Sequence, residues 1–199
     1  MANPNSYVVL DVETGGFSAK ENAVVELAYL IIRGDNFTEI CRGQMLIKPY
    51  NLELIYTEEA EKVHGISKEM LYDEGIELTE CLDRFSRDLK LAKISSSAGA
   101  SPVLVGHNIL FDVAFIQQLF HYGPKKFKLS SLVNGKLDFY GNFQPTVIDT
   151  LHLSRLIWQA DEDVNKYDLA RTMERAELEM TDAHRAMNDV EGTKSFFVW

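Results

Sequence analysis

The stretch Tyr7-Val8-Val9-Leu10-Asp11-Val12-Glu13 decides the fold of this 199-residue chain. Its β-branched and apolar run predicts a buried strand. Side chains alternate between the two faces of a strand, so Asp11 and Glu13 project from the same face. Two neighbouring carboxylates repel each other, and a hard divalent cation placed between them removes that repulsion. The stretch therefore predicts a strand that carries part of a metal site.

Later segments supply further polar side chains. Gly106-His107-Asn108-Ile109-Leu110-Phe111-Asp112 ends in a carboxylate, and Asp189 supplies another. His184, with four residues between it and Asp189, adds a base that titrates near neutrality. Asp149 directly precedes an expected helix, where an N-cap role fits it better than metal binding. The predicted metal ligands are therefore Asp11, Glu13, Asp112 and Asp189.

The order Asp11, Glu13, Asp112, His184, Asp189 resembles the signature of the DEDDh exonucleases. This family includes the proofreading subunit of bacterial DNA polymerase III, ribonuclease T and oligoribonuclease. A lone Asp-x-Glu is a weak signal, whereas all five residues in this order are a strong one. The resemblance implies an α/β fold with a ribonuclease H-like mixed sheet flanked by helices.

The resemblance extends from about Tyr7 to the last expected helix. It includes Val63-His64-Gly65-Ile66-Ser67, which is similar to a short His-Gly-Ile segment of the family. A tyrosine branch of the family places its Tyr one residue closer to the last Asp, and position 185 here is Arg. The chain therefore fits the His branch, and we expect residues 1–199 to form a single exonuclease domain.

The implied activity is metal-dependent 3'–5' hydrolysis of phosphodiester bonds, with release of nucleoside 5'-monophosphates. Two Mg²⁺ ions, for which Mn²⁺ can substitute, suit ligands that are all oxygen atoms. Asp11 is expected to bridge both ions, Glu13 and Asp189 to complete the shell of one, and Asp112 to bind the other. His184 is expected to take the proton from the attacking water.

Several residues are expected to contact the substrate. Thr14 and Gly15 follow the carboxylate pair, where glycine lets a ligand approach the backbone closely; the alternative is an ordinary turn after the strand. The resemblance makes Val63 and His64 candidates for the terminal nucleotide, although His64 is also an ordinary residue for a helix end. Asn108 is expected to reach the substrate, with His107 orienting its loop.

Composition agrees with one globular α/β domain, since 46% of the residues are hydrophobic and 25% are charged. The formal net charge of −10 is unusual for a nucleic-acid-binding protein, but bound metal would screen four of the acids. We see no membrane-spanning stretch and no signal peptide, and Cys41 and Cys81 have no metal-ligand spacing. These observations predict a cytoplasmic protein.

Hydrophobic periodicity predicts the elements. Residues 122–145 are rich in Gly, Asn, Ser and Lys, with Asn134-Gly135 as a hairpin signal. Strands are expected at 7–13, 23–33, 37–48, 103–106 and 146–148, and helices at 57–63, 67–73, 78–92, 109–121, 150–159, 166–176 and 182–198.

Competing functions remain open at this point. Single-stranded 3' ends of DNA are the favoured substrate. The alternative is an RNA-trimming exoribonuclease like ribonuclease T, because no residue in the sequence identifies a contact to the 2'-hydroxyl. A non-catalytic binding module of the same fold would be expected to lack a metal ligand. A DNA polymerase is a possible partner, and the sequence does not indicate the oligomeric state.

Overall fold

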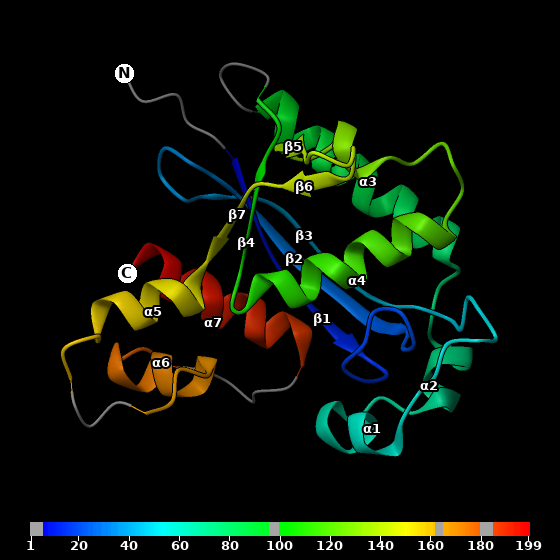
Figure 1. Ribbon diagram of the computed structural model, residues 1–199, viewed down its shortest axis with the longest axis horizontal. Coiled ribbons are helices and arrows are strands. Elements are labelled where there is room, and N and C mark those ends of the chain that lie inside the picture. Colours follow the sequence, from blue (N-terminus) through cyan, green and yellow to red (C-terminus); the bar gives the residue numbers. More distant parts are fainter. Residues whose placement is uncertain (1–5, 96–99, 162–164, 180–184) are drawn as a thin grey trace.

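A five-stranded sheet forms the centre of the computed structural model, which describes residues 6–95, 100–161, 165–179 and 185–199 (Figure 1). The strand order is β3-β2-β1-β4-β7. β2 runs antiparallel to β1 and β3, whereas β4 runs parallel to β1 and β7, so the sheet is mixed as expected. The strands are β1 (Ser6–Thr14), β2 (Val24–Arg33), β3 (Glu39–Leu46), β4 (Val103–Gly106) and β7 (Val147–Asp149).

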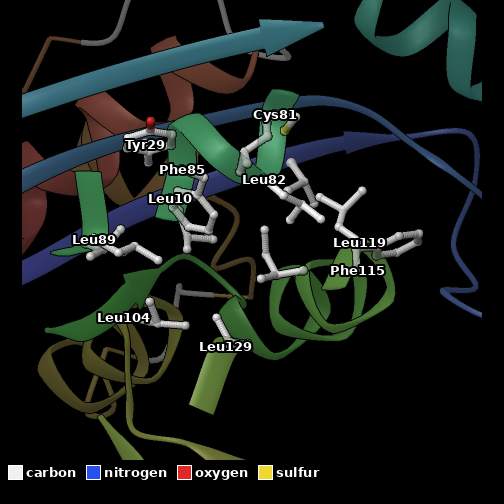
Figure 2. Packing of buried hydrophobic residues seen from close by; sticks show 14 of the residues in the cluster. Leu10, Tyr29, Cys81, Leu82, Phe85, Leu89, Leu104, Phe115, Leu119 and Leu129 are labelled. Atoms are coloured by element: carbon white, nitrogen blue, oxygen red, sulfur yellow. The ribbon is translucent and has the colours of Figure 1, made fainter. Parts of the chain in front are cut away.

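One face of the sheet packs against α3 (Leu78–Ser95) and α4 (Ile109–Tyr122). The even-numbered residues Val8, Leu10 and Val12 of β1 point to this side. Figure 2 shows Leu10 from the sheet next to Phe85 from α3, and Leu104 and Leu119 belong to the same apolar cluster. This is the larger apolar core, and it fixes α4 against the end of β1.

The opposite face packs against α7 (Ala186–Val198). Val9 of β1 joins Ala28, Leu30 and Val105 beneath Ala186 and Val190 of this helix. Because side chains alternate along a strand, Asp11 and Glu13 point to the same side as Val9. The fold therefore brings the two carboxylates of β1 to the beginning of α7.

Four shorter helices and a hairpin complete the described part. The helices are α1 (Glu58–His64), α2 (Lys68–Asp73), α5 (Thr150–Ile157) and α6 (Leu169–Arg175), with a 3₁₀ turn η1 (Leu129–Ser131), and the hairpin pairs β5 (Gly135–Leu137) with β6 (Phe143–Pro145). None of the helices in the described ranges is both long and apolar enough to span a bilayer. Cys41 and Cys81 are free thiols.

The hairpin turn lies elsewhere than predicted. Asn134-Gly135 begins β5, and the turn is formed by Asp138–Asn142. The Asp138 carboxylate accepts the backbone N–H groups of Tyr140 and Asn142 at 2.9 and 2.8 Å, and Gly141 adopts a φ of 82°. The prediction was wrong because an Asx-type turn satisfied the backbone here.

Two helices begin at least three residues later than expected. α6 begins at Leu169 instead of 166, because the Asp168 carboxylate caps it by accepting the Arg171 N–H at 3.1 Å. α7 begins at Ala186 instead of 182, with Arg185 at its N-cap. The predicted cap at Thr181 or Asp182 lies outside the described residues.

Candidate active site

Three of the four predicted metal ligands meet above β1. One carboxylate oxygen each from Asp11, Glu13 and Asp189 lies within 4.8 Å of the other two. Asp11 and Glu13 come from the strand, and Asp189 comes from the first turn of α7. All three side chains are partly buried. The structure therefore brings together three of the predicted acids from opposite ends of the chain.

Asp112 approaches the same strand from its edge. It lies in the first turn of α4, is 3% exposed, and its Oδ1 accepts the Val12 N–H at 3.1 Å. β4 pairs with β1 only as far as Val9, so the edge of β1 beyond that point is open for a side chain. Asp112 thus lies beside the carboxylate trio without being part of it.

The four carboxylates perturb one another's ionisation. Burial raises the pKa of Asp11 well above its usual range, and the charges of Asp112, Asp189 and Glu13 raise it further. Burial, followed by the charges of Asp189 and Glu26, raises the pKa of Glu13 to about 7. Burial also raises the pKa of Asp112, although the Val12 N–H opposes that rise.

These shifts and the donor set fit a divalent cation. Hard cations prefer carboxylate oxygens, and a cation between the acids would replace their repulsion with attraction. Asp11, Glu13 and Asp189 could hold the cation directly, and Asp112 could complete the site.

Glu26 on β2 is a site residue that sequence reasoning missed. It is directly opposite Glu13 in the β1–β2 register and is 1% exposed. Its carboxylate accepts from Arg185 at 3.1 Å, from the Ala186 N–H at 3.2 Å and from Gln44 Nε2 at 2.9 Å. Glu26 therefore fastens the first residue of α7 to the sheet and helps to place Asp189. The available signal was a single acid in the otherwise apolar buried run of β2.

The loop between β4 and α4 is held from both sides. Asp149 caps α5 by accepting the Leu151 N–H at 2.9 Å, as predicted, and the same Oδ1 accepts the Asn108 N–H at 2.9 Å. His107 contacts Thr150 Oγ1 through Nδ1 at 3.1 Å and the Tyr167 carbonyl through Nε2 at 2.7 Å. This leaves His107 in the orienting role expected of it, and Asn108 exposed in a left-handed conformation with a φ of 65°.

An apolar pocket of about 240 Å³ adjoins Glu13. Thr14, Val63 and His64 line it, together with Phe17 and Phe111, which sequence reasoning did not select. His64 is 6% exposed and accepts the Ile66 N–H through Nδ1 at 3.0 Å, and burial lowers its pKa. The pocket thus places two aromatic rings and an imidazole of lowered pKa next to Glu13.

Gly15 lies at the back of this region. A Cβ at Gly15 would be 2.5 Å from the Ile55 carbonyl oxygen and 3.0 Å from Tyr56 Cα. Its N–H donates to the Ala23 carbonyl, and its carbonyl accepts from the Thr57 N–H. The close passage of residues 55–57 therefore requires glycine here.

His184, the predicted general base, lies outside the described residues. It immediately precedes Arg185, which Glu26 holds at the beginning of α7. Its role stays a prediction.

Known proteins are similar to this chain in sequence or in fold. An exonuclease family model matches residues 8–197. The chain belongs to this exonuclease family. The match confirms the resemblance to the DEDDh exonucleases, and it spans every residue of that signature.

The relatives include much longer proteins. A PolC-type DNA polymerase III from Caldanaerobacter subterraneus subsp. tengcongensis is 31% identical over 196 residues, and one from Bacillus cereus is 29% identical over 192 residues. These matches cover 96% and 94% of this chain but 11% of each relative. The chain therefore corresponds to about one ninth of those polymerases.

Solved structures show the same fold. E. coli exonuclease I in complex with a dT13 oligonucleotide matches with a TM-score of 0.71 and 17% identity, covering 97% of this chain and 40% of that one. The apo form of exonuclease I matches with a TM-score of 0.68 and 16% identity. The mixed sheet flanked by helices is thus the ribonuclease H-like exonuclease fold, as expected.

Proposed function

We propose that this chain is a metal-dependent 3'–5' exonuclease that releases nucleoside 5'-monophosphates from single-stranded nucleic acid, with DNA favoured. The observation that carries the proposal is the carboxylate trio of Asp11, Glu13 and Asp189, whose oxygens lie within 4.8 Å of one another beside a pocket. Membership of the exonuclease family supports it. We also propose that residues 1–199 act as one exonuclease domain.

The carboxylates would hold two Mg²⁺ ions, or Mn²⁺ in their place. Asp11 would help to hold both ions, because the charges of Asp112, Asp189 and Glu13 all act on it. When bound, the ions supply positive charge that stabilises the oxygens of the phosphoryl group during hydrolysis. Glu26 maintains the site by fixing the beginning of α7.

His184 would accept the proton of the attacking water. Its ordinary pKa near 6.5 lets a neutral imidazole act as a base at physiological pH. It directly precedes Arg185, whose guanidinium is held by Glu26 at 3.1 Å. This anchor supports the proposal, because Arg185 follows His184 directly in the sequence.

The pocket next to Glu13 would take the 3'-terminal nucleotide. Val63 is 58% exposed at its wall and offers an apolar surface to the base, and Phe111 offers an aromatic ring. Thr14 and His64 line the same pocket. Gly15 would let the substrate approach the backbone next to the pocket. Asn108 would contact the nucleic-acid strand on the other side of Asp112.

DNA is favoured because the relatives are DNA polymerases and the similar exonuclease I structure contains a dT13 oligonucleotide. The PolC-type relatives carry the matching region inside a longer polymerase, so a polymerase partner is part of the proposal. We retain the cytoplasmic location as a prediction. The chain keeps all five signature residues, which argues against a non-catalytic module.

Digestion of matched 5'-labelled DNA and RNA strands tests this proposal. Wild-type protein with Mg²⁺ should give a ladder that shortens from the 3' end, with DNA shortened faster, and chelator should stop it. Asp11→Asn should be inactive, whereas Asp83→Asn, on the exposed side of α3, should match the wild type. Faster loss of RNA would favour the ribonuclease T-like alternative, and metal-independent or absent cleavage would refute the proposal.

A further inference from the structure

A second hollow lies at the beginning of α4, apart from the pocket next to Glu13. This cleft has a volume of about 520 Å³ and runs between the β4–α4 loop and the helices α5 and α6. The helices α5 and α6 lie side by side (Figure 1). A hydrogen bond of 2.9 Å between the hydroxyls of Ser154 and Thr172 joins them. The cleft is lined by His107, Asn108, Leu151, Arg155, Tyr167, Asp168 and Leu169.

The cleft and the proposed metal site share the β4–α4 loop. Asn108 lines it and is the N-cap residue of α4, one turn before Asp112. His107 lines it as well and joins Thr150 of α5 to the Tyr167 carbonyl through its two ring nitrogens. A ligand in the cleft would therefore contact the same loop that places Asp112.

Two arginines lie near the aromatic ring of Tyr167, and one of them, Arg155, lines the cleft with Tyr167. The guanidinium carbon of Arg155 is 5.8 Å from the centroid of the Tyr167 ring, and that of Arg175 is 5.4 Å away. Arg155 is exposed, and Nη1 of Arg175 is buried with no hydrogen-bond partner among the described residues. The site thus offers positive charge and an aromatic surface together.

Among the described residues, Arg155 and Arg175 differ from every other arginine in having no carboxylate partner. The arginines paired with a carboxylate are Arg33, Arg42, Arg84, Arg87, Arg171 and Arg185. The carboxylate of Asp168 also lines the cleft, but it is engaged as the N-cap of α6. Arg175 does not line the cleft, and its Nη2 donates to the Lys166 carbonyl at 2.6 Å. Arg155 is therefore the arginine that faces the cleft, and an exposed arginine without a carboxylate partner among the described residues, in a chain with a formal net charge of −10, indicates an anionic ligand.

A single nucleic-acid strand has the matching chemistry. Its phosphates bind guanidinium groups, and its bases stack on aromatic rings and on guanidinium planes. The pocket beside Phe111 would hold the terminal nucleotide, and the cleft beside Asn108 begins on the same turn of α4. If one strand occupied both hollows, its scissile phosphate would lie beside the carboxylates.

We propose that Arg155 and Tyr167 extend the substrate site and bind a nucleotide on the 5' side of the scissile bond. Arg155 contacts its phosphate and Tyr167 its base, and Asn108 lies between this nucleotide and the metal site. The inference rests on the proposed exonuclease function. Contacts in the cleft would make a strand bind more tightly than a single nucleotide.

The test compares a substrate that reaches the cleft with one that cannot. The long substrate is a thymidine decanucleotide, and the short one is the p-nitrophenyl ester of thymidine 5'-monophosphate. Arg155→Gln and Tyr167→Leu should each raise KM for the decanucleotide about 10-fold, as expected for the loss of one phosphate or stacking contact. They should leave kcat/KM for the short ester unchanged.

Matched variants separate binding from folding. Arg87→Gln removes an exposed arginine of α3 and should leave both substrates unaffected. Arg155→Lys keeps the charge and should retain part of the affinity, and Tyr167→Phe keeps the ring and should retain most of it. If Arg155→Gln does not fold, these two conservative variants carry the comparison.

Direct binding gives a second measurement that does not depend on turnover. The affinity for a labelled decanucleotide is measured by fluorescence anisotropy at several salt concentrations, with chelator present to prevent cleavage. Arg155→Gln should reduce the magnitude of the slope of log affinity against log salt concentration by roughly 0.7, the value for one lost phosphate contact on a single strand. An unchanged slope with an unchanged KM would overturn the inference while leaving the exonuclease proposal standing. Equal losses on both substrates would also overturn it, and failure of the wild type to cleave either substrate would instead refute the proposed function.

Discussion

Replacing Glu13 with glutamine should stabilise the metal-free protein at neutral and alkaline pH. Glu13 has a folded-state pKa of about 7, raised from an ordinary value of 4.5 by burial and by the charges of Asp189 and Glu26. The stability linked to protonated Glu13 is fully present below about pH 4.5. It is lost as the pH rises through about 7, because the folded state must then ionise a carboxyl group that resists ionisation.

The size of the effect follows from the two pKa values. Each pKa unit of difference between the folded and unfolded states corresponds to about 1.4 kcal/mol. The difference between 4.5 and about 7 for Glu13 therefore costs the metal-free protein about 3 kcal/mol above neutral pH. Glutamine has nearly the same shape and no charge, so Glu13→Gln should recover that energy. For a chain of this length, the gain corresponds to an increase in Tm of about 6–12 °C.

Thermal and urea unfolding in the presence of chelator, at about pH 4 and about pH 8, measures the difference in stability between Glu13→Gln and the wild type. Glu13→Gln should exceed the wild type in stability at the higher pH and match it at the lower pH. Glu53→Gln, an exposed acid between β3 and α1, should show no such dependence. Equal stability of Glu13→Gln and wild type at about pH 8 would refute the electrostatic account of the site.

Three further predictions concern the same region. Mn²⁺ at about 100 times its dissociation constant should stabilise the wild type by about 2.7 kcal/mol, measured as a rise in Tm, and Asp11→Asn should show little of this rise. Glu26→Ala should lower the free energy of unfolding by about 2–3 kcal/mol, because it removes a buried carboxylate that accepts several hydrogen bonds. It should also reduce the rise in Tm caused by Mn²⁺. An unchanged rise would mean that Glu26 does not place Asp189. His184→Ala should nearly abolish turnover while leaving the Mn²⁺-dependent rise in Tm intact, and wild-type turnover would exclude it as the base.

The sequence predicted the parts of the fold that depend on local periodicity. The strand around Asp11 and the helix that carries Asp112 were recognisable from their apolar patterns, and the DEDDh order brought the distant acids together. The cap at Asp149 was also recognisable, because an acid directly before a helix has a local reason to be there.

The remaining features depend on contacts between distant segments. Glu26 becomes part of the site only through the strand register that places it opposite Glu13, which its own neighbours in the sequence do not specify. Arg155 and Tyr167 meet because α5 and α6 pack together. The hairpin turn at Asp138–Asn142 depended on a side chain that competes with the expected Asn134-Gly135 turn.

The first product released from a strand with a unique 3' nucleotide tests the central claim most directly. The substrate is a thymidine oligonucleotide that ends in a single 3'-terminal deoxyadenosine, incubated with Mg²⁺ and analysed by chromatography over time. Deoxyadenosine 5'-monophosphate should appear first and be followed by thymidine 5'-monophosphate, with no products from Asp11→Asn. Release of thymidine products before the deoxyadenosine nucleotide, or of nucleoside 3'-monophosphates, would contradict a 3'–5' exonuclease built on Asp11, Glu13 and Asp189.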